Sequence, residues 1–566
     1  MPFRPSRLAP ALLFAAALAA GVPAVSAAEV SGPYLAARTA IRSNDFAEAA
    51  GYFTRALVRE PANPAFLEGA LIAQVGQGNV KAAVPVARRI VALGGQSQIA
   101  QIVLLVDQVA RGEFVQAVAD LAAGRRLGPL PDALTEAWGE VGAGRMAEAL
   151  VAFDRLAAAP GLGAFGAYHK ALALALAGDF EGADTAMAAD PGGFRTTRRG
   201  AIAHAQILSQ AERFDAAAAA LESVFGDDRD PELDALRAAL AAGRPVPFDI
   251  VRSPAEGFAE AFFSLAAALQ GEVSNDQTLV YIRMAQHLRP DHADANLVAG
   301  SLLSALGQHA LAIETYRAIP ASNPAFMQAE MARAQALFAA DRRDEATAVL
   351  RGLAGTHGGY AQVHIAFGDI LRRQDMFAEA AAAYGRAIDL LGPPEPRHWS
   401  LYYSRAIAYE RARDWDRAEP DFRKALELNP DQPQVLNYLG YSFLEMNRNI
   451  EEAMDMIERA VARAPDEGHI IDSLAWGLYL LGRYDEAVEP MERASILMPV
   501  DPIVTDHLGD IYWAVGRRIE ARFQWRRALS FEPDDELAAR IRAKLDRGLD
   551  AVLEAEGAVP LAARGQ

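Results

Sequence analysis

A small residue, nearly always alanine, recurs at an almost constant spacing through the second half of the chain. The recurrence constrains the fold more than any other feature of the 566 residues. Each of these residues lies in the second of two amphipathic helical stretches joined by a short turn. The spacings are 34, 34, 38, 35, 34 and 34 residues, for Ala312, Ala346, Ala380, Ala418, Ala453, Ala487 and Ala521. Because such a helix pair buries its apolar face only against neighbouring pairs, the spacing predicts an all-α repeat solenoid.

The same period continues upstream with a weaker sequence pattern. Its spacings are 34, 34, 32, 34 and 33 residues, for Ala49, Ala83, Ala117, Ala149, Ala183 and Ala216. The first unit keeps Phe53, Ala56 and Pro61, whereas the following units lack most of the aromatic residues. We therefore expect about 13 repeat units in all, with degenerate repeats in the first half. A different array of helical hairpins is the alternative for that half.

The most complete unit is the last one, residues 506–533, which reads DHLGDIYWAVGRRIEARFQWRRALSFEP. It resembles the tetratricopeptide repeat family, whose signature here falls on Leu508, Gly509, Tyr512, Ala521, Trp525, Ala528 and Pro533. The resemblance implies a right-handed superhelical solenoid of antiparallel helix pairs. The small residues let paired helices approach each other closely, while the aromatic residue four positions later fills the space between them.

Interruptions of the period suggest the domain boundaries. A gap of 62 residues separates Ala216 from Thr278 and contains a proline-rich stretch. We expect an N-terminal degenerate solenoid over 29–243, a hinge over 244–253 and a C-terminal solenoid over 254–533. Residues 534–566 are expected to form a capping helix and a tail, since the last repeat would otherwise expose an apolar face.

Residues 1–28 have the pattern of a secretory signal peptide. Two arginines, Arg4 and Arg7, precede an apolar run over 8–20, and small residues precede Glu29. The alternative, an uncleaved anchor, is disfavoured because about 13 apolar residues are fewer than the roughly 20 that span a bilayer. The chain contains no Cys to carry a bacterial lipid anchor. We therefore expect a periplasmic protein that is neither lipid-anchored nor membrane-spanning.

The charge balance bears on the class of partner. The formal net charge is −18, and only four lysines occur. Nucleic acid is excluded as a partner, because binding a polyanion requires clustered cations. An acidic scaffold suits a protein or peptide with basic or apolar segments.

No constellation of catalytic or cofactor-binding residues is apparent. The string GLGAFG at 161–166 matches a dinucleotide-binding pattern, but no predicted strand precedes it. His287 and His292, with Asp291, lie on either side of Pro290, and a solvated turn explains them better than a metal site. We expect no enzyme activity, no cofactor and no metal, with a hidden enzyme dependent on His287 or His292 as the alternative.

The resemblance also selects candidate binding residues, because in this family the first helix of each pair lines the concave surface. The inner positions of the last four pairs are Tyr403 and Ile407; Asn437 and Tyr441; Asp472, Trp476 and Tyr479; and Asp506, Asp510 and Trp513. This selection predicts an aromatic and acidic groove. For Trp476 and Trp513, packing between helices is the alternative. Family members that clamp a peptide carboxylate use Lys and Asn at such positions, so that clamp is not expected.

These features favour an exported scaffold or adaptor that binds an envelope protein. A weaker resemblance to Gram-negative envelope repeat proteins, some of which serve periplasmic proteases, suggests a protease or its substrates as the partner. The alternative is a polysaccharide or peptidoglycan assembly factor that stacks sugar rings on the same aromatic residues. Self-association through the end faces stays open.

Overall fold

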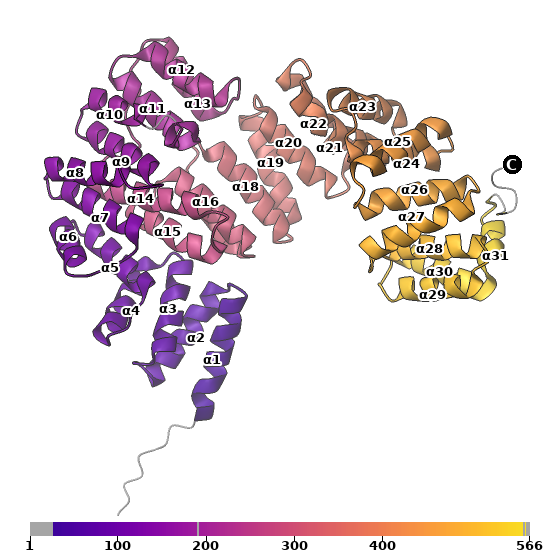
Figure 1. Ribbon diagram of the computed structural model, residues 1–566, viewed down its shortest axis with the longest axis horizontal. Coiled ribbons are helices and arrows are strands. Elements are labelled where there is room, and N and C mark those ends of the chain that lie inside the picture. Colours follow the sequence, from indigo (N-terminus) through magenta and orange to yellow (C-terminus); the bar gives the residue numbers. More distant parts are fainter. Residues whose placement is uncertain (1–26, 190–191, 559–560, 562–566) are drawn as a thin grey trace, which may run out of the picture. The chain divides into compact units, whose positions relative to one another are not determined.

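The computed structural model describes residues 27–189, 192–558 and 561, in which every regular element is helical (Figure 1). The predicted signal peptide therefore lies almost entirely outside the described residues. The only bridge of strand type among the described residues is an isolated one that joins Gln270 and Val273. The prediction of an all-α array of helix pairs is confirmed. None of the described helices is long and apolar enough to cross a membrane.

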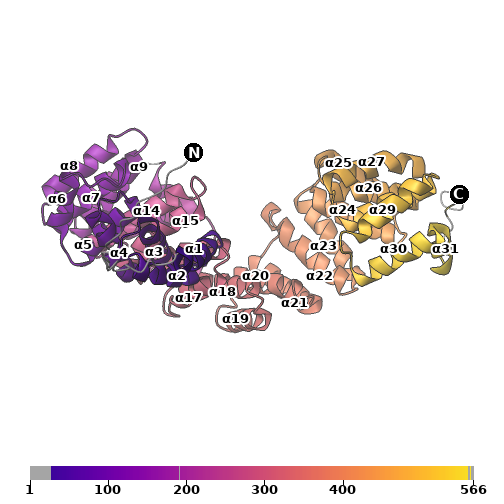
Figure 2. The same ribbon diagram turned by 90° about the horizontal axis from the view of Figure 1, so that it is seen from below.

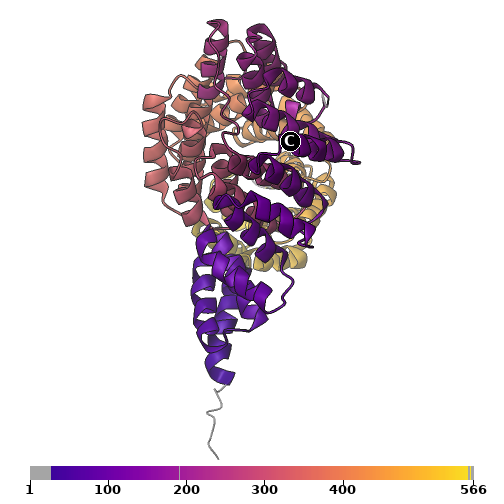
Figure 3. The same ribbon diagram turned by 90° about the vertical axis from the view of Figure 1, so that its left-hand side faces the viewer.

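The chain divides into two compact units, residues 1–341 and 342–566. The helices of the first unit are α1 (Ala27–Arg42), α2 (Phe46–Arg59), α3 (Pro64–Gly76), α4 (Val80–Ala92), α5 (Gln98–Ala110), α6 (Phe114–Ala122), α7 (Pro129–Gly142), α8 (Met146–Ala157), α9 (Gly163–Leu176), α10 (Phe180–Ala188), α11 (Arg198–Gln210), α12 (Phe214–Phe225), α13 (Pro231–Ala241), α14 (Pro254–Leu269), α15 (Asn275–Leu288), α16 (Ala293–Ala305), α17 (His309–Arg317) and α18 (Phe326–Ala339). Neighbouring pairs stack side by side, as the indigo helices α1 to α4 show (Figures 1 and 3).

The second unit continues the array of helix pairs. Its helices are α19 (Arg343–Thr356), α20 (Ala361–Arg372), α21 (Phe377–Leu391), α22 (Trp399–Arg411), α23 (Trp415–Leu428), α24 (Pro433–Glu445), α25 (Ile450–Arg463), α26 (Gly468–Leu480), α27 (Tyr484–Leu497), α28 (Pro502–Ala514), α29 (Arg518–Leu529), α30 (Asp535–Arg547) and α31 (Leu549–Ala555). Short 3-10 turns occur at Phe194–Thr196 in the first unit and Pro396–His398 in the second.

The recurrent alanine is the fourth residue of the second helix in both units. In each pair it is fully buried, at 0 % exposure, for Ala49, Ala83, Ala117, Ala149, Ala183, Ala217, Ala312, Ala346, Ala380, Ala418, Ala453, Ala487 and Ala521. The sixth position was predicted one residue too early, because α12 begins at Phe214 and its fourth residue is Ala217 rather than Ala216. In the alanine-rich run of this helix, composition alone does not fix the register.

A glycine of the first helix often faces the aromatic residue of the second. A Cβ built on Gly509 in α28 would lie 2.4 Å from the Trp525 ring, and one on Gly368 in α20 would lie 2.6 Å from the Tyr384 ring. Trp525 and Tyr384 are both fully buried. Glycine is therefore needed at these places, because the ring occupies the space of its missing side chain.

The segment predicted as a hinge, 244–253, lies inside the first unit rather than between the two units. It runs along α11, where Val246 N–H donates to Ser209 Oγ at 2.8 Å and Gln206 Nε2 donates to Asp249 at 2.8 Å. Ile250 and Val251 are buried. The prolines follow the end of a helix, but hydrogen bonds and burial hold the segment after it in place. The domain boundary expected from the sequence therefore differs from the structural one.

Beyond this segment, α14 and α15 turn back onto the start of the unit. Helix α14 contacts α5, α7 and α9, and α15 contacts α3, α4 and α5 (Figures 1 and 2). Most of these are the first helices of their pairs. The first helices of the N-terminal pairs thus face a hairpin of the same chain, which we call the return hairpin (residues 254–288).

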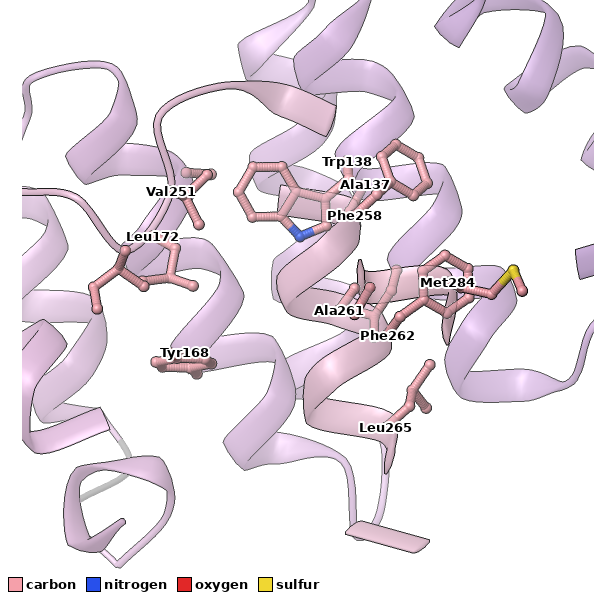
Figure 4. Packing of buried hydrophobic residues seen from close by; sticks show 14 of the residues in the cluster. Ala137, Trp138, Tyr168, Leu172, Val251, Phe258, Ala261, Phe262, Leu265 and Met284 are labelled. Atoms are coloured by element: carbon pink, nitrogen blue, oxygen red, sulfur yellow. The ribbon is translucent and has the colours of Figure 1, made fainter. Parts of the chain in front are cut away.

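Apolar packing holds the return hairpin in place. Trp138 of α7 is fully buried and lies beside Phe258 of α14, with Phe262 and Met284 in the same cluster (Figure 4). A Cβ built on Gly257 would lie 2.2 Å from the Trp138 ring. The two helices therefore approach so closely that only glycine fits at position 257.

A buried ionic network adds to this packing. The carboxylate of Glu260, in α14, is 1 % exposed and accepts hydrogen bonds from Tyr168 Oη at 2.8 Å and Arg199 Nη2 at 2.8 Å. Arg199 also donates to Asp294 at 2.7 Å. Burial alone would raise the pKa of Glu260, but Arg199 and His292 outweigh it and hold that pKa well below its usual range. The network ties α9, α11 and α16 to the return hairpin.

At the other end of the chain, α30 closes the last repeat of the second unit. Its residues Ala538 and Ile541 are buried, as the cap expected from the sequence requires. The ammonium group of Lys544 is fully buried and lies 2.7 Å from carboxylate oxygens of both Asp506 and Asp510 in α28. Trp525 Nε1 donates to Asp510 at 2.9 Å. The cap is thus fastened by charge as well as by apolar contact.

We predict that Gly257→Ala destabilises the first unit while Gly51→Ala does not. The added methyl group at 257 meets the Trp138 ring and should cost about 1–3 kcal/mol of unfolding free energy by overpacking. At Gly51, inside α2, the nearest atom to a new Cβ is 3.7 Å away. That substitution should stabilise the chain by up to about 1 kcal/mol through helix propensity. Urea unfolding curves measure both, and equal effects of the two substitutions would contradict the close contact.

We predict that Lys544→Met destabilises the second unit by about 3–5 kcal/mol, because it leaves two buried carboxylates without their cation. Adding Asp506→Asn and Asp510→Asn should restore much of that loss. Lys424→Met is the matched control, since Lys424 forms a surface pair with Glu427 at 2.7 Å and should change stability by less than about 1 kcal/mol. Unfolding followed by tryptophan fluorescence reports the difference, and similar effects at 544 and 424 would overturn the prediction.

Candidate functional site

The ten residues predicted to form the groove all lie on first helices of the second unit: α22, α24, α26 and α28. The structure separates them by burial. Tyr403, Asn437, Tyr441 and Trp476 are half-buried, whereas Asp472, Tyr479, Asp506, Asp510 and Trp513 are buried. All three predicted acidic positions are therefore closed to a partner.

Asp506 and Asp510 already have an ionic partner within the chain. Lys544 of α30 neutralises them, and Arg540 approaches Asp510 to 3.8 Å. Burial and the neighbouring Asp510 nevertheless raise the pKa of Asp506. The prediction that these two carboxylates recognise an external cation does not fit this geometry, because the cap supplies the cation. The capping helix was expected from the sequence, but not the direction of its single buried lysine.

Trp513 belongs to the same closed end of the unit. Its Nε1 donates to Asp550 at 2.8 Å, and its ring lies 5.3 Å from that of Trp525. Gly548, at φ +86°, comes so close that a Cβ there would lie 2.7 Å from the indole. The alternative of packing between helices holds for Trp513, which is 8 % exposed.

Asp472 is paired with a histidine that sequence reasoning passed over. His507 Nδ1 lies 3.0 Å from Asp472, and the His507 ring stacks on Trp476 with centroids 3.8 Å apart. Burial would lower the pKa of His507, but Asp472 and the other nearby carboxylates outweigh burial and raise it. Trp476 also stacks on the buried Tyr479 at 4.6 Å. Stacking on His507 and Tyr479 thus uses the faces of the Trp476 indole in packing, while the side chain stays half-buried.

Tyr403 packs among aromatic residues of its own repeat and of the following one. Its ring centroid lies 6.0 Å from Phe422 and 6.1 Å from Tyr438. Ile407, one turn later in α22, is also half-buried against the same core. Both side chains therefore serve mainly to fill the space between α22, α23 and α24.

Asn437 and Tyr441 of α24 remain as half-buried polar groups of the predicted groove. The Oδ1 atom of Asn437 is buried and has no hydrogen-bond partner among the described residues. The pKa of Tyr441 is raised by burial and by the nearby Glu445 and Asp472. Tyr441 is hydrogen-bonded to Glu445, and Asn437 Oδ1 is an unused acceptor. No buried lysine of the described residues occupies this surface as Lys544 occupies the closed end.

Glu410 and Glu445 are two carboxylates that sequence reasoning did not select. They lie near the C-terminal ends of the adjacent first helices α22 and α24. Glu410 accepts a hydrogen bond from Tyr438 at 2.9 Å, and neither residue forms an ion pair within the described part of the chain. The pKa of Glu445 is raised by shielding from water and by Glu410. The sequence did contain an indication of Glu445, since this residue follows the selected Tyr441 by one helical turn and so lies on the same helix face.

The residues weighed for metal or nucleotide binding have structural roles. His292 caps α16 by accepting from Ala295 N–H at 3.3 Å, and its other nitrogen lies 3.3 Å from Glu260. Within the described residues, no group of three or more His, Asp or Glu side chains is arranged to hold a metal ion. In the string at 161–166, Gly166 lies against α8, where a Cβ would be 2.3 Å from Ala157 N. That glycine serves helix packing.

A family model described as tetratricopeptide repeat matches residues 34–97, 365–418 and 403–468. Over 221 residues the chain is 28% identical to the TPR repeat-containing protein PA4667 of Pseudomonas aeruginosa, which covers 39% of this chain and 36% of that protein. Over 177 residues it is 24% identical to the human protein O-mannosyl-transferase TMTC1, covering 31% of this chain and 20% of that protein. The chain thus spans about a third and a fifth of these two relatives, so the activity of the whole transferase is not carried over.

Among solved structures, the Cut9–Hcn1 hetero-tetramer of the APC/C is similar at 14% identity with a TM-score of 0.38, over 92% of this chain and 96% of that one. Yeast Tom70 is similar at 14% identity with a TM-score of 0.35, over 94% and 96%. At TM-scores this low, neither likeness decides anything about partners. The helix pairs, the buried small residues and the matched family model agree with the resemblance stated from the sequence, and the chain contains tetratricopeptide repeats within residues 34–97 and 365–468.

Proposed function

We propose that this protein is an exported scaffold that binds a protein segment carrying basic or apolar side chains through the middle of its second unit. The general role rests on the repeat, whose stacked helices present a surface suited to binding protein rather than to catalysis. The partner class, the surface and the location are the finer parts of the proposal.

The observation that carries the proposed surface is the pair of carboxylates Glu410 and Glu445 beside half-buried Tyr441. Because no cation of the described residues pairs with them, their mutual repulsion is relieved when a Lys or Arg side chain arrives from a partner. Trp476 and Tyr441 add apolar area, and aromatic residues of this kind are frequent binding anchors. We call this surface the Glu410/Glu445 patch, with Asn437, Tyr441 and Trp476 as its other members.

An envelope protein, such as a periplasmic protease or one of its substrates, is the partner proposed for this patch. The support is the pattern of residues 1–28, in which Arg4 and Arg7 precede an apolar run and small residues. The matched relatives, whose names indicate a repeat protein and a mannosyl-transferase, supply no partner.

We predict that a random-peptide library panned against the protein is enriched in peptides with Lys or Arg next to apolar residues. The double substitution Glu410→Gln with Glu445→Gln should weaken such peptides about tenfold, which corresponds to about 1.4 kcal/mol. Glu427→Gln with Glu458→Gln removes the same charge from the second helices α23 and α25 and should leave the affinity unchanged. Enrichment of acidic peptides, or equal loss in both double variants, would rule out the patch.

We predict that the full chain, expressed in a Gram-negative host, is recovered from the periplasm without residues 1–27 or 1–28. The two cleavage points follow from small residues at the positions before Glu29. Arg4→Glu with Arg7→Glu should reduce export by removing the basic segment. Mass spectrometry of the N-terminus and cell fractionation give the result, and an intact N-terminus in the cytoplasm would refute export.

A further inference from the structure

The first unit contains a cavity of about 470 Å³ where the return hairpin meets α3, α4, α16 and α17. Its wall is mixed, and its polar side chains include Gln77, Lys81, Arg283, Gln286, His287 and Asn296. The elements concerned lie far apart in the sequence, and all of them belong to the first unit. The cavity therefore exists only because α15 folds back onto α3 and α4.

Arg283 is a buried cation without a carboxylate partner. It is 6 % exposed, and its Nε and Nη2 atoms donate to the carbonyl oxygen of Gly76 at 3.1 Å and 2.9 Å. Its Nη1 atom donates to Gln286 Oε1 at 2.9 Å. All three acceptor contacts are neutral. Burial lowers the pKa of Arg283 to about 10, so the side chain stays charged at neutral pH.

The neutral network continues away from the guanidinium without meeting an anion. Gln286 Nε2 donates to Asn296 Oδ1 at 2.7 Å, and Asn296 Nδ2 donates to Pro290 O at 3.0 Å. Gly76 is the last residue of α3, so the helix dipole offers Arg283 at most about half a negative charge. The positive charge is thus only partly compensated.

The guanidinium of Arg283 also has N–H donors that form no hydrogen bond with the described residues. An arginine has five N–H groups, and three of those of Arg283 are used in the bonds to Gly76 and Gln286. One N–H on each terminal nitrogen remains without a partner among the described residues. Free N–H donors on a guanidinium can each donate to an oxygen of a carboxylate or phosphate.

A second cation lines the same cavity. Three of the four lysines form ion pairs, Lys170 with Asp154, Lys424 with Glu427, and Lys544 with Asp506 and Asp510. Lys81 is exposed at the cavity wall and has no ion pair within the part of the chain that the structure describes. It is close enough to lower the pKa of the half-buried His287, together with burial.

The acidic groups near the cavity are engaged elsewhere. Glu314, in the wall, pairs with Arg317 at 2.6 Å, and both side chains are more than half exposed to solvent. Asp107, near His287, lies 2.9 Å from Arg88 and 3.0 Å from Arg111. Neither carboxylate neutralises Arg283 or Lys81.

We propose that this cavity is a binding site for an oxyanionic group, a phosphate or a carboxylate, held by Arg283 and Lys81. The site is independent of the Glu410/Glu445 patch, which lies in the other unit and attracts cations. A chain with a net charge of −18 repels anions in general, so a site of this kind selects its ligand by geometry as well as charge.

The proposal is tested by isothermal titration calorimetry of the full chain with sodium phosphate and, separately, sodium acetate, at constant ionic strength with chloride as the background anion. Lys81→Gln is the informative variant, because Lys81 is exposed and its loss should leave the fold intact. We expect wild type to bind at least one of the two anions and Lys81→Gln to bind it about tenfold more weakly. Lys424→Gln, the matched control on α23, should equal wild type.

Hydrogen exchange of the same samples locates the bound anion, with added protection expected around residues 76–81 and 283–290. Binding of phosphate alone assigns the site to a phosphate group, and acetate binding of similar strength assigns it to a carboxylate. Any of three results would overturn the proposal. They are no binding of either anion at about 10 mM, equal affinity of Lys81→Gln and Lys424→Gln, and protection confined to other segments.

Discussion

The close approach of paired helices, made possible by a buried alanine at the fourth position of thirteen second helices, is the constraint on which the rest of the structure depends. At 0 % exposure these side chains leave no room for another methylene group. Where a helix meets an aromatic ring more closely still, it carries a glycine, as at Gly509 against Trp525 and Gly257 against Trp138. Because each pair buries its apolar face only against its neighbours, any ending of the array must be covered by something else.

Parts of this chain provide that cover. In the first unit the return hairpin lies against the first helices of the N-terminal pairs, fixed by Trp138 and by the Glu260 network. In the second unit α30 covers the last pair and inserts Lys544 between Asp506 and Asp510. At two places, segments of the same chain thus cover surfaces that a repeat protein can offer to a partner. The proposed binding surface accordingly lies in the middle of the second unit.

Charge compensation separates structural from available polar groups in both units. Glu260 and Asp510 are buried and well supplied with donors, so they contribute to stability and specificity of packing rather than to binding. Glu410, Glu445 and Arg283 lack an opposite charge among the described residues. An uncompensated charge at a partly accessible place is the physical reason to expect a ligand of opposite sign. By this criterion the two units attract opposite kinds of group.

The sequence by itself determined the helix pairs, because helical periodicity and the 34-residue recurrence of alanine depend only on local residues and nearest neighbours. It also indicated the capping helix after Pro533, and it placed Tyr403, Asn437, Tyr441 and Trp476 on first helices, where the structure has them. Only the tertiary structure decided that 244–253 runs along α11, that the return hairpin reaches α3 and that Lys544 neutralises Asp506. These contacts join residues up to 207 positions apart, as Arg283 and Gly76 are, and no local periodicity encodes which distant helix meets which.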